Sequence, residues 1–221
     1  GENFVRRVLG RGPSVAAIRG GLQDNLEGYF DFFAGLLDQP DVTLTGDITP
    51  AYSGLSVPIL ETIRDGLSRR GIPVRAMFLM RDPVGRCVSA TQMNRRKGTQ
   101  NEGVPVSGDL DSAALAYAQT PQSRVRADYA HTVTALRQVF PEEDLFFGLY
   151  ETLFLPDEIA RMSDFAGVAC RPDMAEHQVN AHAKTEAVSA KTQAQLRTLF
   201  DPTYIFCAEA FPETRQVWMP A

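Results

Sequence analysis

The apolar run Val74-Arg75-Ala76-Met77-Phe78-Leu79-Met80 narrows the folds open to this chain more than any other feature. A short run of this kind predicts a strand that is buried on both faces, which is typical of a parallel sheet. Arg81-Asp82-Pro83 follows it directly. Because aspartate caps free helix amides and proline is tolerated at the first helical position, we expect a helix from Pro83 to about Arg96.

Further along the chain, β-rich and helical patterns alternate in the same way. Strands are predicted at Val42–Ile48 and Leu145–Tyr150, and helices at residues 57–70, 124–140, 156–166 and 189–200. The stretch Asn94–Gly108 is rich in charge and glycine, which indicates a long exposed loop. Strands that alternate with helices predict an α/β fold with a central parallel sheet. Ligands of such sheets bind beyond the carboxyl ends of the strands, where Arg81 falls.

Size and charge limit the class of protein. With 221 residues, 44% of them hydrophobic, the chain can bury one substantial core, so a single domain over residues 1–221 is expected. The net charge of -5 argues against a general attraction to nucleic acid or anionic lipid. No apolar run approaches the roughly 18 to 20 residues of a membrane span, and Gly1–Arg11 lacks the apolar core of a signal peptide. We therefore expect a soluble, cytoplasmic protein.

The cysteines and histidines do not follow a metal-binding or disulfide pattern. Cys87, Cys170 and Cys207 are widely spaced and odd in number, which argues against a disulfide framework and a four-ligand zinc site. The three histidines do not pair with them at metal-ligand spacing. We expect a reducing compartment and no structural metal.

Arg81 and Ser89 are the strongest candidate ligand-binding pair. A cation at the end of a buried strand and a hydroxyl about two turns along the next helix can hold a phosphate between them, and free helix amides add to the positive field. The alternative is that Arg81 pairs with a surface carboxylate and that Ser89 is an ordinary hydroxyl on a helix surface.

The segment Phe78–Ser89 resembles the 3′-phosphate-binding segment of the sulfotransferase family. Gly46–Tyr52 is similar to the Glu-Lys-Thr-Pro-x-Tyr stretch that precedes this segment in heparan sulfate sulfotransferases and many bacterial relatives, with Asp47 in place of Glu and Ile48 in place of Lys. Tyr129–Leu153 resembles the family's Tyr-led helix, Phe-Pro break and Tyr-Glu-x-Leu strand end. Ser189–Pro202 resembles its closing helix, so the match is colinear over about residues 46–202.

This resemblance implies a three-layer fold like that of P-loop nucleoside triphosphate hydrolases. It also implies transfer of a sulfuryl group from 3′-phosphoadenosine 5′-phosphosulfate to a hydroxyl or amine of a carbohydrate or small molecule, without a metal. Arg81 and Ser89 would hold the 3′-phosphate of this donor and of its product, 3′-phosphoadenosine 5′-phosphate. The alternatives are a non-catalytic nucleotide-binding module of the same fold and a nucleotide kinase, which would need a Gly-Lys-Ser or Gly-Lys-Thr loop.

Two segments that the family's reaction uses are not found in this sequence. The first is a Lys-x-Gly-Thr-Thr-like loop, whose lysine would stabilise charge on the leaving nucleotide, and the second is the glutamate base that follows it. Residues 1–41 resemble the helical stretch that comes after both, so we expect this amino-terminal portion outside the chain. Asp47 is the best candidate for a substitute base, ahead of His131 and His182. Lys184 is a candidate contact to the sulfate donor. The cations of Arg95-Arg96-Lys97 could bind an anionic acceptor substrate.

Overall fold

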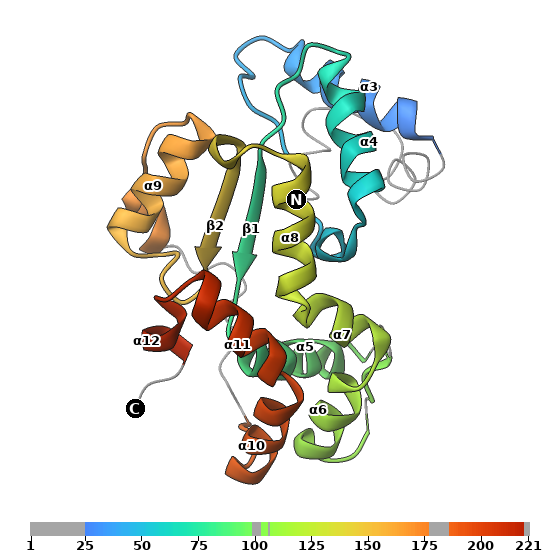
Figure 1. Cartoon of the computed structure of the whole chain (residues 1–221), viewed down its shortest axis with the longest axis vertical. Helices are drawn as coiled ribbons and strands as arrows, with labels where there is room; N and C mark the ends of the chain where they lie inside the picture. The colour runs from blue at the N-terminus through green and yellow to red at the C-terminus, as the bar shows by residue number, and fades with distance from the viewer. Residues whose placement is uncertain (1–24, 99–102, 106, 177–185, 219–221) are drawn as a thin grey trace. The chain divides into compact units, whose positions relative to one another are not determined.

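The computed structural model describes residues 25–98, 103–105, 107–176 and 186–218 (Figure 1). The chain divides into two compact units, one made of Gly1–Ile48 and Glu61–Val74 and the other of Thr49–Leu60 and Arg75–Ala221. The second unit contains Arg81 and Ser89. The expectation of one domain over residues 1–221 stays a prediction.

In the first unit, helix α3 (Leu26–Leu37) packs with the part of α4 (Val57–Ser68) that belongs to this unit. The ring of Phe30 is 1% exposed and covers Gly66, where a Cβ atom would lie 2.2 Å from the ring. Arg70 forms ion pairs with Glu27 at 2.7 Å and with Asp31 at 2.6 Å. The contact of Phe30 with Gly66 and the ion pairs of Arg70 therefore join the two helical segments.

The predicted strand Val42–Ile48 is wrong, since these residues form no regular structure. Leu44 is 53% exposed and Ile48 is 97% exposed, so the apolar side chains that suggested a strand are not covered. A strand needs a neighbour to satisfy its backbone groups, and no described strand pairs with this segment.

The second unit contains a parallel sheet of two strands, β1 (Ala76–Met80) and β2 (Leu145–Leu149). Ala76 pairs with Leu145, and the register runs without a bulge to Met80 opposite Leu149. The described part of the chain is thus helix-rich with a small parallel sheet, which is compatible with the predicted α/β class. β1 begins two residues later than predicted and β2 ends one residue earlier.

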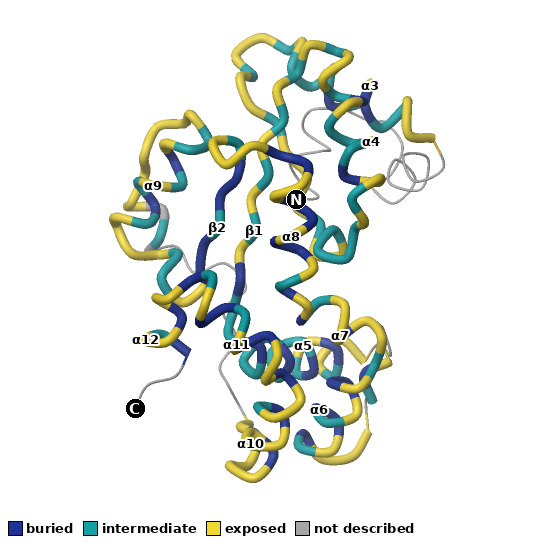
Figure 2. The backbone as a smooth tube through the Cα atoms, in the orientation of Figure 1, coloured by how far each residue is buried: buried dark blue, intermediate teal, exposed yellow. Residues whose placement is uncertain are grey.

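Helices cover the sheet on its sides and at its carboxyl end (Figure 1). Helix α8 (Tyr129–Val139) packs against β1, and α9 (Pro156–Ala166) packs against β2. Three helices, α5 (Pro83–Lys97), α11 (Asp201–Ala210) and α12 (Thr214–Trp218), lie towards the ends at which both strands finish. β2 is mostly buried, whereas alternate residues of β1 are exposed (Figure 2). The prediction that the apolar run is buried on both faces is therefore wrong for Met77 and Leu79, which are each 43% exposed.

The remaining described elements are helices α6 (Leu110–Ala118), α7 (Pro121–Ala127) and α10 (Ala190–Leu199), with three short 3-10 helices at Pro50–Gly54, Glu142–Asp144 and Pro172–Glu176. Residues from α6, α7 and α10 share one core with residues from α5, α8, α11, α12 and both strands. Its large members include Met80, Tyr117, Tyr129, Leu149, Leu196, Phe200, Tyr204 and Trp218. None of the helices within the described ranges is long and apolar enough to cross a membrane.

Local capping corrects one predicted helix and the start of one predicted loop. The predicted helix at residues 124–140 is divided between α7 and α8, because the side chain of Asp128 accepts a hydrogen bond from the backbone N–H of His131 and begins a new helix. α5 continues to Lys97, where Gly98 adopts a left-handed conformation with φ of 61°. The predicted loop from Asn94 therefore begins inside this helix.

Candidate functional site

The side chain of Arg81 lies at the carboxyl end of the sheet. Arg81 follows β1, Tyr150 follows β2, and the backbone N–H of Tyr150 donates to the carbonyl of Met80 at 2.7 Å. The guanidinium carbon of Arg81 lies 4.5 Å from the centroid of the Tyr150 ring. Among the described residues Arg81 has this cation-π contact and no ion pair with a surface carboxylate, which was the alternative interpretation. Arg81 is half-buried, and Tyr150 is 44% exposed.

A buried tyrosine fixes the backbone of Arg81. The hydroxyl of Tyr129 donates to the carbonyl of Arg81 at 2.8 Å, and the backbone N–H of Arg81 lies 3.4 Å from the same hydroxyl. Tyr129 is 2% exposed, and this burial raises the pKa of its phenol to about 12. The phenol therefore keeps its proton, and its capacity to donate, well above neutral pH.

Asp82 joins the strand end to helix α5. One of its carboxylate oxygens accepts from the backbone N–H of Gly85 and the other accepts from the hydroxyl of Tyr204. Its own backbone N–H donates to Glu151 at 2.9 Å. The other oxygen of Glu151 accepts from the indole N–H of Trp218, also at 2.9 Å. Sequence reasoning predicted the cap by Asp82 but not the contacts from Tyr204, Glu151 and Trp218.

Ser89 and Arg86 lie on the helix that Asp82 begins. Ser89 is half-buried, six residues beyond Pro83, or about 9 Å along the helix axis at about 1.5 Å per residue. Its hydroxyl makes no hydrogen bond within the described ranges and can take a new partner. Arg86, which the sequence analysis did not select, donates from Nη2 to the carbonyl of Ser123 at 3.2 Å. The buried Nε of Arg86 has no described partner.

The other predicted site residues are not brought to Arg81 by any described contact. Asp47 belongs to the first unit, is exposed, and accepts a hydrogen bond from the hydroxyl of Tyr29 at 3.2 Å. The strand that was expected to present Asp47 is not formed, so its role as a base stays a prediction. His131 is exposed and its Nε2 lies 3.2 Å from the carbonyl of Leu55. Lys184 and His182 lie outside the described residues.

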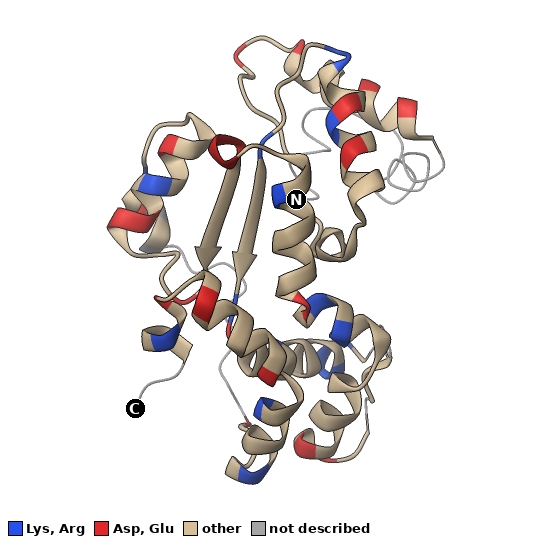
Figure 3. Ribbon diagram, viewed as in Figure 1, with Lys and Arg blue, Asp and Glu red and all other residues tan. Residues whose placement is uncertain are grey.

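The cations of Arg95-Arg96-Lys97 are at the carboxyl end of α5, away from its capped first turn. Arg95 donates to the backbone carbonyls of Gly108 and Asp109 at 2.7 and 2.9 Å, so its guanidinium is held by the residues that precede α6. In the view of Figure 3, basic and acidic residues are interspersed along the helices. With a net charge of -5, an anionic ligand must therefore be held by local groups.

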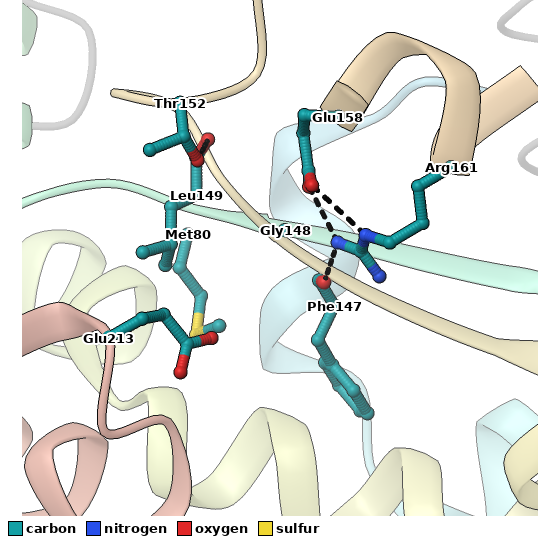
Figure 4. A pocket seen from close by; sticks show the side chains of 8 residues that line it. All are labelled: Met80, Phe147, Gly148, Leu149, Thr152, Glu158, Arg161 and Glu213. Carbon is teal, nitrogen blue, oxygen red and sulfur yellow. Dashed lines mark hydrogen bonds and ion pairs between the residues drawn. The ribbon is translucent and has the colours of Figure 1, made fainter. Parts of the chain in front are cut away.

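A cavity of about 190 Å³ lies against β2 and is lined by Met80, Phe147, Gly148, Leu149, Thr152, Glu158, Arg161 and Glu213 (Figure 4). Glu158 pairs with Arg161 at 2.5 Å, and Arg161 also donates to the carbonyl of Phe147 at 2.6 Å. The polar groups on this side of the cavity therefore satisfy one another. Neither Arg81 nor Ser89 lines the cavity, so it does not coincide with the predicted phosphate site.

The three cysteines differ in exposure, which predicts their reactivity. Burial raises the pKa of Cys87 to about 11 and that of Cys207 to about 12, whereas Cys170 is exposed. We expect a chromogenic disulfide reagent at pH 8 to modify one thiol rapidly in the folded chain and all three after unfolding. The Cys170→Ser variant should lose the rapid phase. Rapid modification of a second thiol in the folded chain would contradict the burial of Cys87 and Cys207.

Among the described residues, no three His, Cys, Asp or Glu side chains gather in a way that could hold a metal ion. The chain was also compared with protein-family models, curated proteins and solved structures, and none of them matches it. The candidate site is therefore defined by its geometry: a strand end, Arg81 over Tyr150, a capped helix, and Ser89 two turns along.

Proposed function

We propose that this chain is a sulfotransferase with a fold of the P-loop type, and that it binds 3′-phosphoadenosine 5′-phosphosulfate. The observation that carries the proposal is the geometry of Arg81. Its guanidinium lies at the carboxyl end of a parallel strand, its described contact is with the face of an aromatic ring, and it makes no ion pair with a described carboxylate. Among the described residues no carboxylate is therefore paired with this guanidinium, so it can bind a phosphate.

The 3′-phosphate of the donor would lie between Arg81, the first turn of α5 and Ser89. The first-turn amides of α5 already have partners: Gly85 donates to the Asp82 side chain, Arg86 donates to the Asp82 carbonyl, and the N–H of Val84 lies 3.4 Å from the Tyr204 hydroxyl. The direct contacts to the phosphate would therefore come from the side chains of Arg81 and Ser89. The dipole of α5 and the nearby charge of Arg86 both favour an anion at this end of the helix. Tyr150 supports the Arg81 guanidinium from one face.

In the proposed reaction, an acceptor oxygen or nitrogen attacks the sulfur atom of the donor. The bond from sulfur to the bridging oxygen of the 5′-phosphate breaks, and its electron pair stays with 3′-phosphoadenosine 5′-phosphate. The acceptor's proton passes to a base. Arg81 and Ser89 would act by orienting the donor through its 3′-phosphate, remote from the bond that breaks. The proposed acceptor is a carbohydrate or a small molecule.

Calorimetric titration with 3′-phosphoadenosine 5′-phosphate tests the donor site. We expect saturable binding, and weaker binding of adenosine 5′-phosphate, which lacks the 3′-phosphate that Arg81 and Ser89 would hold. An absence of heat at millimolar 3′-phosphoadenosine 5′-phosphate would falsify the proposal. Transfer of labelled sulfate from the donor to members of an acceptor library then separates an enzyme from a binding module.

A further inference from the structure

The peptide group between Arg81 and Asp82 is held at both of its ends. Its carbonyl, which belongs to Arg81, accepts a hydrogen bond from Tyr129 at 2.8 Å. Its N–H, which belongs to Asp82, donates to Glu151 at 2.9 Å. Because a peptide group is planar, two bonds at opposite ends fix its orientation. That orientation sets the directions of the strand end and of the following helix start.

Glu151 is itself held in place by the last described helix. Its second carboxylate oxygen accepts from the indole N–H of Trp218 at 2.9 Å. Trp218 is 6% exposed, and its ring packs near those of Tyr129 and Tyr204, with centroids 6.3 Å from each. Glu151 is exposed, so without Trp218 its side chain would be free to adopt other rotamers. Trp218 therefore restricts the residue that holds the peptide N–H.

A second contact, made by Tyr204, holds the side chain of Asp82 in place. Tyr204 donates its hydroxyl to one oxygen of Asp82, and that hydroxyl lies 3.4 Å from the backbone N–H of Val84. The guanidinium carbon of Arg197 lies 3.4 Å from the centroid of the Tyr204 ring. The turn between β1 and α5 is thus braced by α11 as well as by α12.

We propose that Glu151 and Trp218 are positioning residues for the phosphate site, and that they act by orienting the peptide group between Arg81 and Asp82. This inference rests on the proposed function, because the ligand that Arg81 meets is the 3′-phosphate. Neither Glu151 nor Trp218 needs to touch the nucleotide. Their effect reaches it through the direction of the Arg81 side chain and of helix α5, which carries Ser89.

Two conservative variants test this positioning role. Trp218→Phe keeps an aromatic ring between Tyr129 and Tyr204 but removes the N–H donor. Glu151→Gln keeps the length of the side chain but leaves one oxygen to serve two donors. We expect each variant to bind 3′-phosphoadenosine 5′-phosphate about 3- to 10-fold more weakly, on the scale of one lost hydrogen bond. The affinity for adenosine 5′-phosphate should change much less.

The double variant and a matched control make the test specific. Because Glu151 and Trp218 act through one chain of bonds, the double variant should lose no more affinity than the more affected single variant. Glu143→Gln removes an exposed carboxylate near the opposite end of β2 and should leave the affinity unchanged. Hydrogen exchange at the Asp82 amide gives a reading without ligand, and both single variants should accelerate it several-fold.

The outcomes separate this inference from the proposed function. If the unchanged chain binds 3′-phosphoadenosine 5′-phosphate and the two variants bind it equally well, the positioning role is overturned and the donor site stands. If the unchanged chain does not bind, the proposed function fails. Unchanged exchange of the Asp82 amide in both variants would overturn the positioning role whether or not the chain binds the nucleotide.

Discussion

The Arg81→Ala variant is expected to bind 3′-phosphoadenosine 5′-phosphate about 10- to 150-fold more weakly than the unchanged chain, since hydrogen bonds to a charged group contribute about 1.5–3 kcal/mol each. The loss should be large because Arg81 makes no ion pair with a described carboxylate, so its charge is available to the ligand. Calorimetric titration measures this effect. The affinity for adenosine 5′-phosphate should change much less, because that nucleotide lacks the phosphate that Arg81 would hold.

Two further variants sharpen this prediction. Arg96→Ala removes the same charge from an exposed position at the far end of α5 and serves as the control for net charge. Arg81→Lys keeps the charge but loses the planar fork that can bind a phosphate with two hydrogen bonds, so it should recover only part of the affinity. Equal losses in Arg81→Ala and Arg96→Ala would show that general electrostatics, and not a defined contact, accounts for binding.

Among core substitutions, Leu196→Ala is expected to have a large effect on stability. Leu196 on α10 is 0% exposed and lies in the core that joins this helix to α5 and α6. Removing its buried side chain should lower the free energy of unfolding by about 2–5 kcal/mol, through lost transfer energy and the cavity left behind. Denaturation by urea, followed by circular dichroism, measures the change.

The same helix offers a matched control. Leu199 carries the same side chain one turn further along and is 46% exposed. Leu199→Ala should therefore change the free energy of unfolding by less than about 1 kcal/mol, since most of the cost of the Leu196 variant comes from burial. Similar losses in the two variants would contradict the placement of α10 against the core.

The elements next to Arg81 could be predicted because their signals are local. The apolar run identifies β1, Asp82-Pro83 identifies the start of α5, and both appear within two residues of the expected positions. Helix α5 ends at a glycine in the left-handed region, a signal that the sequence also contains. Local chemistry of this kind does not depend on what the rest of the chain does.

The predicted strand at Val42–Ile48 failed because pairing is not local. The sequence shows residues that favour a strand, but it does not show whether a neighbouring strand is available to them. The division between α7 and α8 was missed for a different reason. The regularly spaced apolar side chains begin only at Tyr129, but the predicted helix began at Arg124, so the capping role of Asp128 was not recognised.

The contacts around Arg81 were not predicted either, because the residues that form them are far apart in the sequence. Glu151 is 69 residues from Asp82, and Tyr204 is 122 residues from it. Tyr150 and Glu151 belong to the Tyr-Glu-x-Leu pattern at the strand end, which by itself does not indicate a contact with Arg81 or Asp82. Their position beside Arg81 follows from the pairing of β1 with β2, which the two strand sequences alone do not specify.

The hydrogen bond from Trp218 to Glu151 has a consequence for the order in which parts of the protein fold during synthesis. Tyr204 and Trp218 stand far along the chain from the strand end that they support, and contacts between distant segments form late because loop closure has an entropic cost. During synthesis, β1 and α5 leave the ribosome well before α11 and α12 do. The turn that carries Arg81 can therefore be held by its full set of contacts only after residue 218 has emerged, so we expect a nascent chain to bind the nucleotide several-fold more weakly until then.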